Sequence, residues 1–235
     1  MKLPSQPFVL LLALVATSSA SCVVHVDSDS GAVESSWFSD GDTVRGSGVA
    51  ASQLREVGEF RDVSVSGSAD VRITIGPERS VRVTADDNLI EKVVTRVEDG
   101  SLEIGHERGS YRHRVKLSVE ITTPTLDGVS IAGSGDAHVA GLNTTHFTAS
   151  VVGSGSIRAS GRCDELSASI AGSGDLRLED VVARTATVRI AGSGDARVHA
   201  HEKLEADISG SGDVRYRGQP AVTRHVSGSG SVRHD

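Results

Sequence analysis

The chain has 235 residues and a formal net charge of −7, with 26 glycines and aromatic side chains at only 3% of its positions. A core built from aromatic rings is therefore excluded, and any core must be aliphatic and thin. The negative charge gives no sign of a nucleic-acid binder.

Residues 1–21 have the pattern of a secretory signal peptide. Lys2 is followed by an apolar run from Phe8 to Ala16 and then by small residues up to Cys22. The run is too short to cross a bilayer, which needs about 20 apolar residues. We therefore predict that residues 1–21 are a signal peptide and that the mature chain is exported.

The segment SSASC at residues 18–22 resembles the lipobox of bacterial lipoproteins, with Leu replaced by Ser19. The resemblance implies lipid attachment at Cys22 and contact with the membrane through that anchor. Val23 after the cysteine implies an outer-membrane lipoprotein, facing either the periplasm or the outside. Ordinary cleavage near Ala20, with a free Cys22 thiol, stays open. Residues 22–55 are rich in Ser, Asp and Gly, so we predict a flexible tether there.

One short motif recurs through the second half of the chain at intervals of 18 to 20 residues. An apolar residue lies two positions before each copy, and apolar, basic and usually apolar residues follow it. This alternation is typical of a strand with one buried face. The copies are GSGD at 133–136, 172–175, 192–195 and 210–213, and GSGS at 153–156 and 228–231.

A unit of about 19 residues that reads strand, glycine turn, strand can form one coil of a solenoid. We therefore predict an all-β fold over residues 56–235, a right-handed parallel β-helix or solenoid. Hairpins closed by GSG in an antiparallel meander or sandwich remain the alternative. Recurrence of side-chain types at equal slots favours stacking, which places like residues about 4.8 Å apart.

Three segments carry a resemblance to a known family: FRDVSVSGSADVRITIG, ADDNLIEKVVTRVEDGSLEIG and the repeated IAGSGD. Residues 56–235 resemble the head GIN domain family, an adhesin-associated domain of unknown function in bacterial envelope proteins. The resemblance implies a parallel β-helix-like stack in the cell envelope. The family supplies no catalytic residues to carry over.

The aspartates that end the GSGD motifs are expected to accept hydrogen bonds from nearby amides and to stabilise the turns. They could also contact a cation. The calcium-binding solenoid motif GGxGxD repeats every nine residues, however, so we predict no specific metal site. These aspartates are Asp136, Asp175, Asp195 and Asp213.

A base lies two residues after each of these slots. In a stacked fold the bases would line one face as a ladder, able to meet carboxylates, sulfates or phosphates on a polymer. A solvated face that only keeps the protein soluble is the alternative. The ladder residues are Arg72, His138, Arg158, Arg177, Arg197, Arg215 and Arg233.

Two smaller features carry weaker signals. Arg108 and the stretch from Tyr111 to Arg114 form a basic patch expected on a hairpin, where it could contact a partner. His199 and His201 alternate on one strand face, but two histidines without a third ligand are weak evidence for a metal.

Ser and Asp recur in every copy and do not gather once around a base, so no catalytic residues and no cofactor are predicted. We expect a non-enzymatic envelope protein that mediates adhesion or envelope interaction. Its partner would be a glycan, another envelope protein or a second copy. The alternative is a polysaccharide-processing enzyme on a β-helix scaffold, with clustered carboxylates on one flank.

Overall fold

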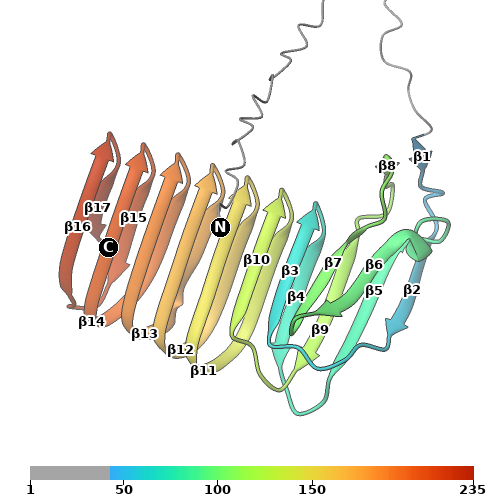
Figure 1. Ribbon diagram of the computed structural model, residues 1–235, viewed down its shortest axis with the longest axis horizontal. Helices are drawn as coiled ribbons and strands as arrows, with labels where there is room; N and C mark the ends of the chain where they lie inside the picture. The colour runs from blue at the N-terminus through green and yellow to red at the C-terminus, as the bar shows by residue number, and fades with distance from the viewer. Residues whose placement is uncertain (1–42) are drawn as a thin grey trace, which may run out of the picture. The chain divides into compact units, whose positions relative to one another are not determined.

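A computed structural model describes residues 43–235, which are mainly β-strand (Figure 1). The helical element of this region is a single 3₁₀ turn at Ile90–Lys92. Within residues 43–235 no helix is long and apolar enough to span a membrane. The predicted signal peptide, Cys22 and the first part of the predicted tether lie outside the described residues.

The repeats form a stack of parallel strands in which every coil lies against the next. Strands that end at a GSG turn make one wall, here called wall A, and strands that begin after the turn make the opposite wall, wall B. Most long strands bend once between two GSG turns, so the first part of such a strand belongs to wall B and its last part belongs to wall A. The strands of the stack are β3 (Asp62–Gly67), β4 (Asp70–Ile75), β10 (Gly128–Gly133), β11 (Asp136–Gly153), β12 (Ser156–Gly172), β13 (Asp175–Gly192), β14 (Asp195–Gly210), β15 (Asp213–Arg217), β16 (Ala221–Gly228) and β17 (Ser231–His234).

The stack is a β-solenoid of about five turns with a spacing of about 20 residues. The predicted all-β solenoid is confirmed, and the antiparallel meander does not describe the repeats, whose strand pairs are parallel throughout.

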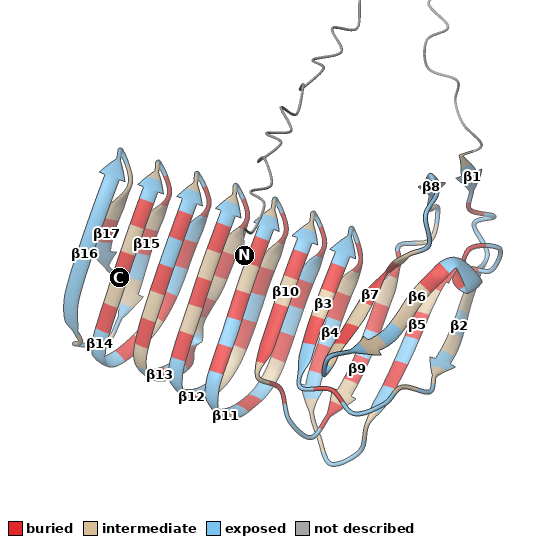
Figure 2. Ribbon diagram, viewed as in Figure 1, coloured by how far each residue is buried: buried red, intermediate tan, exposed pale blue. Residues whose placement is uncertain are grey.

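The register places equivalent residues of successive coils opposite each other, so the core consists of aliphatic rows. Figure 2 shows the resulting alternation of buried and exposed positions along each strand. Burying these rows supplies the main favourable free energy of folding. The wall A row contains Val65, Ile131, Val151, Ile170, Ile190 and Ile208, and the wall B row contains Val71, Ala137, Ile157, Leu176, Ala196 and Val214.

The GSG turn needs its glycines mainly because neighbouring coils approach so closely. Gly153 has a φ of +125°, and a Cβ atom on it would collide with the carbonyl oxygen of Gly133 in the preceding coil. A Cβ atom on Gly155 would meet the carbonyl oxygen of Gly135. Between these glycines, the Ser154 amide donates a 2.9 Å hydrogen bond to the Gly133 oxygen. Stacking therefore selects the motif as much as the turn does.

The N-terminal end of the stack is mixed in strand direction. In wall B, β4 pairs in parallel with β9 (Ser118–Thr123), which pairs antiparallel with β5 (Ser80–Asp86). In wall A, β3 pairs in parallel with β7 (Ser101–His106), which pairs antiparallel with β6 (Val93–Glu98). These strands cover the first coil and extend its core.

The prediction of a flexible tether up to residue 55 is wrong for its last part. β1 (Val44–Arg45) pairs in parallel with β8 (Tyr111–Arg112), and β2 (Ala50–Arg55) pairs antiparallel with β5. The free edge of β5 satisfies the backbone of β2 by hydrogen bonding, which a Ser- and Gly-rich composition does not reveal. The folded region therefore begins before residue 56.

Candidate functional site

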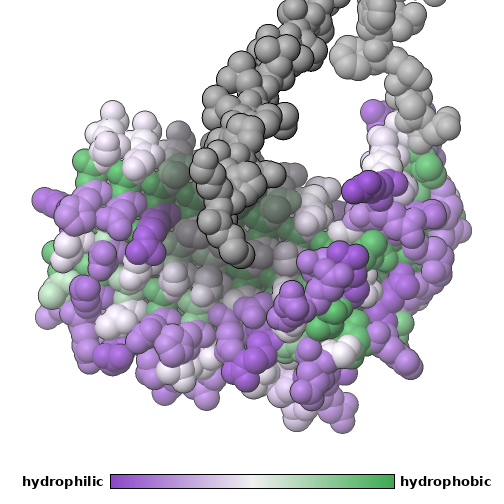
Figure 3. Space-filling view, in the orientation of Figure 1, coloured by the Kyte–Doolittle hydropathy of each residue, from purple (hydrophilic) through white to green (hydrophobic). Residues whose placement is uncertain are grey.

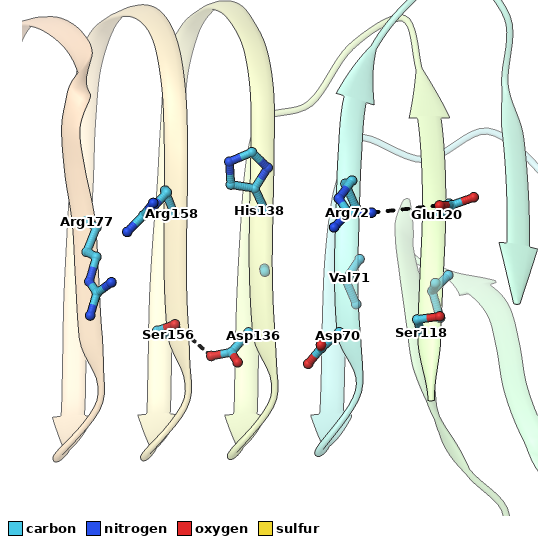
Figure 4. A pocket seen from close by; sticks show the side chains of 12 residues that line it. Asp70, Val71, Arg72, Ser118, Glu120, Asp136, His138, Ser156, Arg158 and Arg177 are labelled. Atoms are coloured by element: carbon cyan, nitrogen blue, oxygen red, sulfur yellow. Dashed lines mark hydrogen bonds and ion pairs between the residues drawn. The ribbon is translucent and has the colours of Figure 1, made fainter. Parts of the chain in front are cut away.

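The predicted bases fall in one continuous row along the outer surface of wall B. Each is the direct register partner of the next, from β4 through β11, β12, β13, β14 and β15 to β17. Figure 4 shows Arg72, His138, Arg158 and Arg177 side by side on adjacent strands. Arg177 is half-buried and the other six are exposed. We call these seven residues the base row: Arg72, His138, Arg158, Arg177, Arg197, Arg215 and Arg233.

A second row, of acids and serines, runs parallel to the base row two residues earlier on each strand. Its hydrogen bonds connect successive coils. The Ser156 hydroxyl donates to Asp136 over 2.6 Å, and the Asp213 amide donates to Asp195 over 2.9 Å. This acid row consists of Asp70, Asp136, Ser156, Asp175, Asp195, Asp213 and Ser231.

Asp213 shows how the two rows influence each other. The Ser231 hydroxyl lies 2.7 Å from its Oδ1 and is the main reason that the pKa of Asp213 is lowered. The Ser231 amide, Arg233 and Arg215 act in the same direction, and partial burial opposes them. Asp213 therefore stays ionised at neutral pH and attracts the guanidiniums of Arg215 and Arg233.

Only part of the base row is neutralised by nearby carboxylates. Arg72 lies 3.8 Å from Glu120, Arg177 lies 3.5 Å from Asp175, and Arg197 lies 3.9 Å from Glu179. Exposed pairs of this kind contribute only about 0–1 kcal/mol each. Within residues 43–235, Arg158, Arg215 and Arg233 have no carboxylate oxygen within 4.0 Å of their guanidinium nitrogens. Several guanidiniums are thus free to bind an added anion.

A shallow hollow of about 340 Å³ lies over the N-terminal part of the base row. Its lining carries both signs of charge, with Arg72, His138 and Arg158 beside Asp136 and Glu120 (Figure 4). The hollow is a shallow depression in this charged surface and extends across several strands.

Wall A presents a different surface. The register partners of Ser130 are Ser64 and Ser150, and Ser150 pairs with Ser169, so small hydroxyl side chains replace the bases there. Charged residues lie only at the two ends of this serine row, with Glu103 beside Ser64 and Arg189 beside Ser169. In the view of Figure 3, hydrophilic side chains gather along the lower part of the stacked strands. A continuous row of bases is specific to wall B.

A larger hollow of about 720 Å³ lies where the long strands bend between walls, beside Cys163, Arg184, His201 and Glu202. Burial, and secondarily Asp164, raise the pKa of the Cys163 thiol to about 11. The Cys163 thiol therefore stays protonated at neutral pH and is a poor nucleophile.

His199 and His201 lie close together, with ring centroids 5.0 Å apart. No third ligand joins them, because residues 43–235 contain no cluster of three His, Cys, Asp or Glu side chains suited to a metal. The acid row likewise forms no such cluster within the described chain.

Sequence reasoning missed the most highly connected carboxylate of the domain. Asp86 is fully buried and accepts hydrogen bonds from the amides of Gly48, Arg114 and Val115 at 2.8, 3.0 and 3.1 Å. The basic patch at residues 108–114 therefore belongs partly to an internal contact. No local signal could reveal it, because the partners lie 28 to 38 residues from Asp86.

A family model described as “Putative auto-transporter adhesin, head GIN domain” matches residues 59–220. The chain belongs to the head GIN domain family. No curated protein matches the chain. The match to the head GIN domain includes the base row from Arg72 to Arg215, while Arg233 lies beyond it.

Several solved structures share the head GIN fold of this chain. A “putative adhesin” from Bacteroides fragilis is 21% identical, with a TM-score of 0.68, and the match covers 82% of this chain and all of that one. A “putative lipid binding protein” from Parabacteroides distasonis is 25% identical, with a TM-score of 0.53. A “putative adhesin” from the same species is 24% identical, with a TM-score of 0.54. Both of the latter matches cover 83% of this chain and all of the other chain.

Proposed function

We propose that this head GIN domain is a non-enzymatic adhesion module of the bacterial envelope that binds an anionic polymer along its base row. The observation that carries the proposal is the unbroken register of seven bases on the outer surface of wall B. The adhesin description of the family supports the same role.

The geometry of the row suits a linear ligand better than a small molecule. Neighbouring residues of the base row are separated by the strand spacing of about 4.8 Å, so a polymer that lies across the strands meets a new base on each strand. Arginine binds carboxylate, sulfate or phosphate oxygens with two parallel hydrogen bonds. An extended glycan with one anionic group per sugar is the partner that this arrangement favours.

The acid row narrows the direction from which an anion can approach. Its carboxylates repel an anionic polymer on one side of the guanidiniums, and three of them are already engaged by the next coil. The polymer is therefore expected to bind on the side of the base row away from the GSG turns. Repulsion between the acid row and the polymer therefore contributes more to the specificity of binding than to its affinity.

The same repetition argues against an enzyme. The acid row has at most one carboxylate in each coil, always at the same slot, so its carboxylates form a row and not a pair facing one bond. A glycosidase needs two carboxylates at a defined separation across one scissile bond. Asp136, Asp175, Asp195 and Asp213 can be changed together to Asn to test this. Glycan cleavage by the wild type that disappears in this variant would favour the enzyme.

Binding can be tested with the purified full-length chain and immobilised polygalacturonate or heparin, with neutral dextran as the reference. Replacing Arg158, Arg177 and Arg197 with Gln should weaken binding by at least about tenfold, since one charge-assisted hydrogen bond contributes roughly 1.5 kcal/mol. Raising the salt concentration should weaken wild-type binding. A matched control changes Arg162, Arg189 and Arg224 to Gln, three exposed arginines off the row. Equal losses in both variants, or equal binding to dextran, would contradict the proposal.

We further propose that Cys22 carries a lipid that anchors the domain to the outer membrane. A multiply acylated cysteine is a firm anchor, because each buried methylene contributes about 0.8 kcal/mol. Labelled palmitate should be incorporated into the wild-type chain and not into Cys22→Ala. Equal labelling of the two would exclude Cys22 as the attachment site.

A second copy or another envelope protein is the remaining partner class. All eight residues of β16 are exposed, and β16 pairs with only β14 among the described strands. Self-association can be tested by sedimentation of the full-length chain at several protein concentrations. If the chain associates with itself, its apparent molecular mass should rise with the protein concentration.

A further inference from the structure

Two histidines on either side of β8 in the sequence meet beside the end of β7. The Nε2 atom of His106, the last residue of β7, lies 2.7 Å from the Nε2 atom of His113. The centroids of the two imidazole rings are 4.7 Å apart, and the Tyr111 ring stacks on His106 with a centroid distance of 5.3 Å. Both histidines are half-buried. Their coordinating nitrogens therefore converge on one small region beside the first coil.

A buried carboxylate lies behind one of the two rings. Asp86 Oδ2 is 3.4 Å from His113 Nδ1, and this nitrogen is buried with no other polar partner. Asp86 is held in place by the amides of Gly48, Arg114 and Val115. A proton on His113 Nδ1 then faces the carboxylate, and the lone pair of Nε2 points at His106. Metal-binding histidines commonly have this arrangement, with the second nitrogen turned toward a carboxylate.

The two Nε2 atoms face each other, and imidazole binds metal ions through a ring nitrogen that carries no proton. The nearby Glu107 carboxylate pairs with Lys92 at 3.0 Å and is therefore engaged elsewhere.

We propose that His106 and His113 bind one divalent transition-metal ion, such as Zn²⁺ or Cu²⁺, through their Nε2 atoms. Imidazole nitrogens favour these ions over Mg²⁺ or Ca²⁺. Here too no third protein ligand is present, because residues 43–235 contain no group of three His, Cys, Asp or Glu side chains suited to a metal. Water fills the remaining positions, so the site is open and binds less tightly than a closed structural zinc site. Tetrahedral coordination requires the two nitrogens to separate to about 3.3 Å, which is a small movement of the His106 ring.

The pair at His199 and His201 provides a built-in comparison. Its rings are also close, with centroids 5.0 Å apart, but no nitrogen–nitrogen contact joins them and the neighbouring Glu202 pairs with Arg184 at 3.1 Å. The second pair lies two residues apart on one strand, and the first pair lies seven residues apart, on either side of β8. The structure thus favours the pair that sequence reasoning did not single out.

Binding is tested by titrating ZnCl₂ into the full-length chain that carries Cys22→Ser, so that residue 22 cannot contribute a sulfur ligand. Calorimetry should show one ion per chain. His106→Gln and His113→Gln should each weaken binding by at least about tenfold, and the double variant His199→Gln/His201→Gln should bind as the parent does. Circular dichroism verifies that every variant is folded.

Two further readouts identify the ligands independently of affinity. Electron paramagnetic resonance of bound Cu²⁺ should show two nitrogen ligands in the parent and fewer in either single variant. Zinc should slow hydrogen exchange at the amides of Gly48, Arg114 and Val115, because the ion ties His113 and Asp86 together. Absence of saturable binding, binding that survives both His106→Gln and His113→Gln, or binding lost in His199→Gln/His201→Gln would each overturn the proposal.

Discussion

Asp213 accepts two hydrogen bonds from Ser231, one from its amide at 2.9 Å and one from its hydroxyl at 2.7 Å. The two residues occupy equivalent slots in neighbouring coils, 18 positions apart. The aspartate after the GSG motif was expected to stabilise its own turn, and here it connects one coil to the next. Ser156 and Asp136 repeat the contact elsewhere in the stack.

The first prediction concerns this connection. Asp213→Ala should lower the free energy of unfolding by about 1–2 kcal/mol, because it removes the acceptor for the Ser231 amide and hydroxyl. Asp180→Ala is the matched control, since Asp180 is exposed and makes no such bond. Denaturant unfolding of both variants measures the difference. Equal effects would show that the bond between coils contributes nothing.

The second prediction tests the close approach of the coils. Gly153→Ala should destabilise the domain by about 3 kcal/mol or more, because the new Cβ atom meets the Gly133 carbonyl oxygen and the backbone has a φ of +125°. Gly58→Ala should be nearly neutral, because no atom lies within 4 Å of the added carbon. Thermal unfolding distinguishes the two. A stable Gly153→Ala protein would contradict the stacking explanation.

The third prediction follows from Asp86. Burial alone would raise the pKa of Asp86, but the amides of Gly48, Val115 and Arg114 and the nearby His113 outweigh it, so the pKa is lowered. A lowered carboxyl pKa in the folded state gives stability that is present above the ordinary value of about 4 and is lost as the pH falls through the lowered value.

The measurement is the pH dependence of unfolding. Asp86→Asn should be less stable than the wild type at pH 7, and the difference should shrink toward pH 2 as Asp86 becomes protonated. Asp180→Asn, which replaces an exposed carboxyl, should show no such trend. A difference that stays constant with pH would mean that the charge of Asp86 does not matter.

The fourth prediction concerns Cys163. Its pKa of about 11 leaves about one thiol in a thousand ionised at pH 8, and the side chain is buried. In a Cys22→Ser background, a thiol reagent should label the native chain very slowly and the unfolded chain rapidly. Rapid labelling of the native chain would show that the bend around Cys163 opens readily.

The position of the base row could be predicted because it depends on local pattern alone. Alternation places Arg158 outward between the buried Ile157 and Ala159, and the recurrence of the motif every 18 to 20 residues places Arg177 and Arg197 in the same row. The same logic predicted the aliphatic rows. The role of the base row in ligand binding stays a prediction that the experiments above test.

The repeat length and the alternation of apolar and polar residues predicted a solenoid and left an antiparallel meander as the alternative. The parallel register of successive coils in the structure decided between the two. Only the tertiary structure decided that residues 50–55 join β5, that Asp86 is buried beneath Gly48 and Arg114, and that His106 meets His113. These contacts join segments that share no repeat. Their partners are selected by which strand edges and buried donors remain unsatisfied after the coils have stacked.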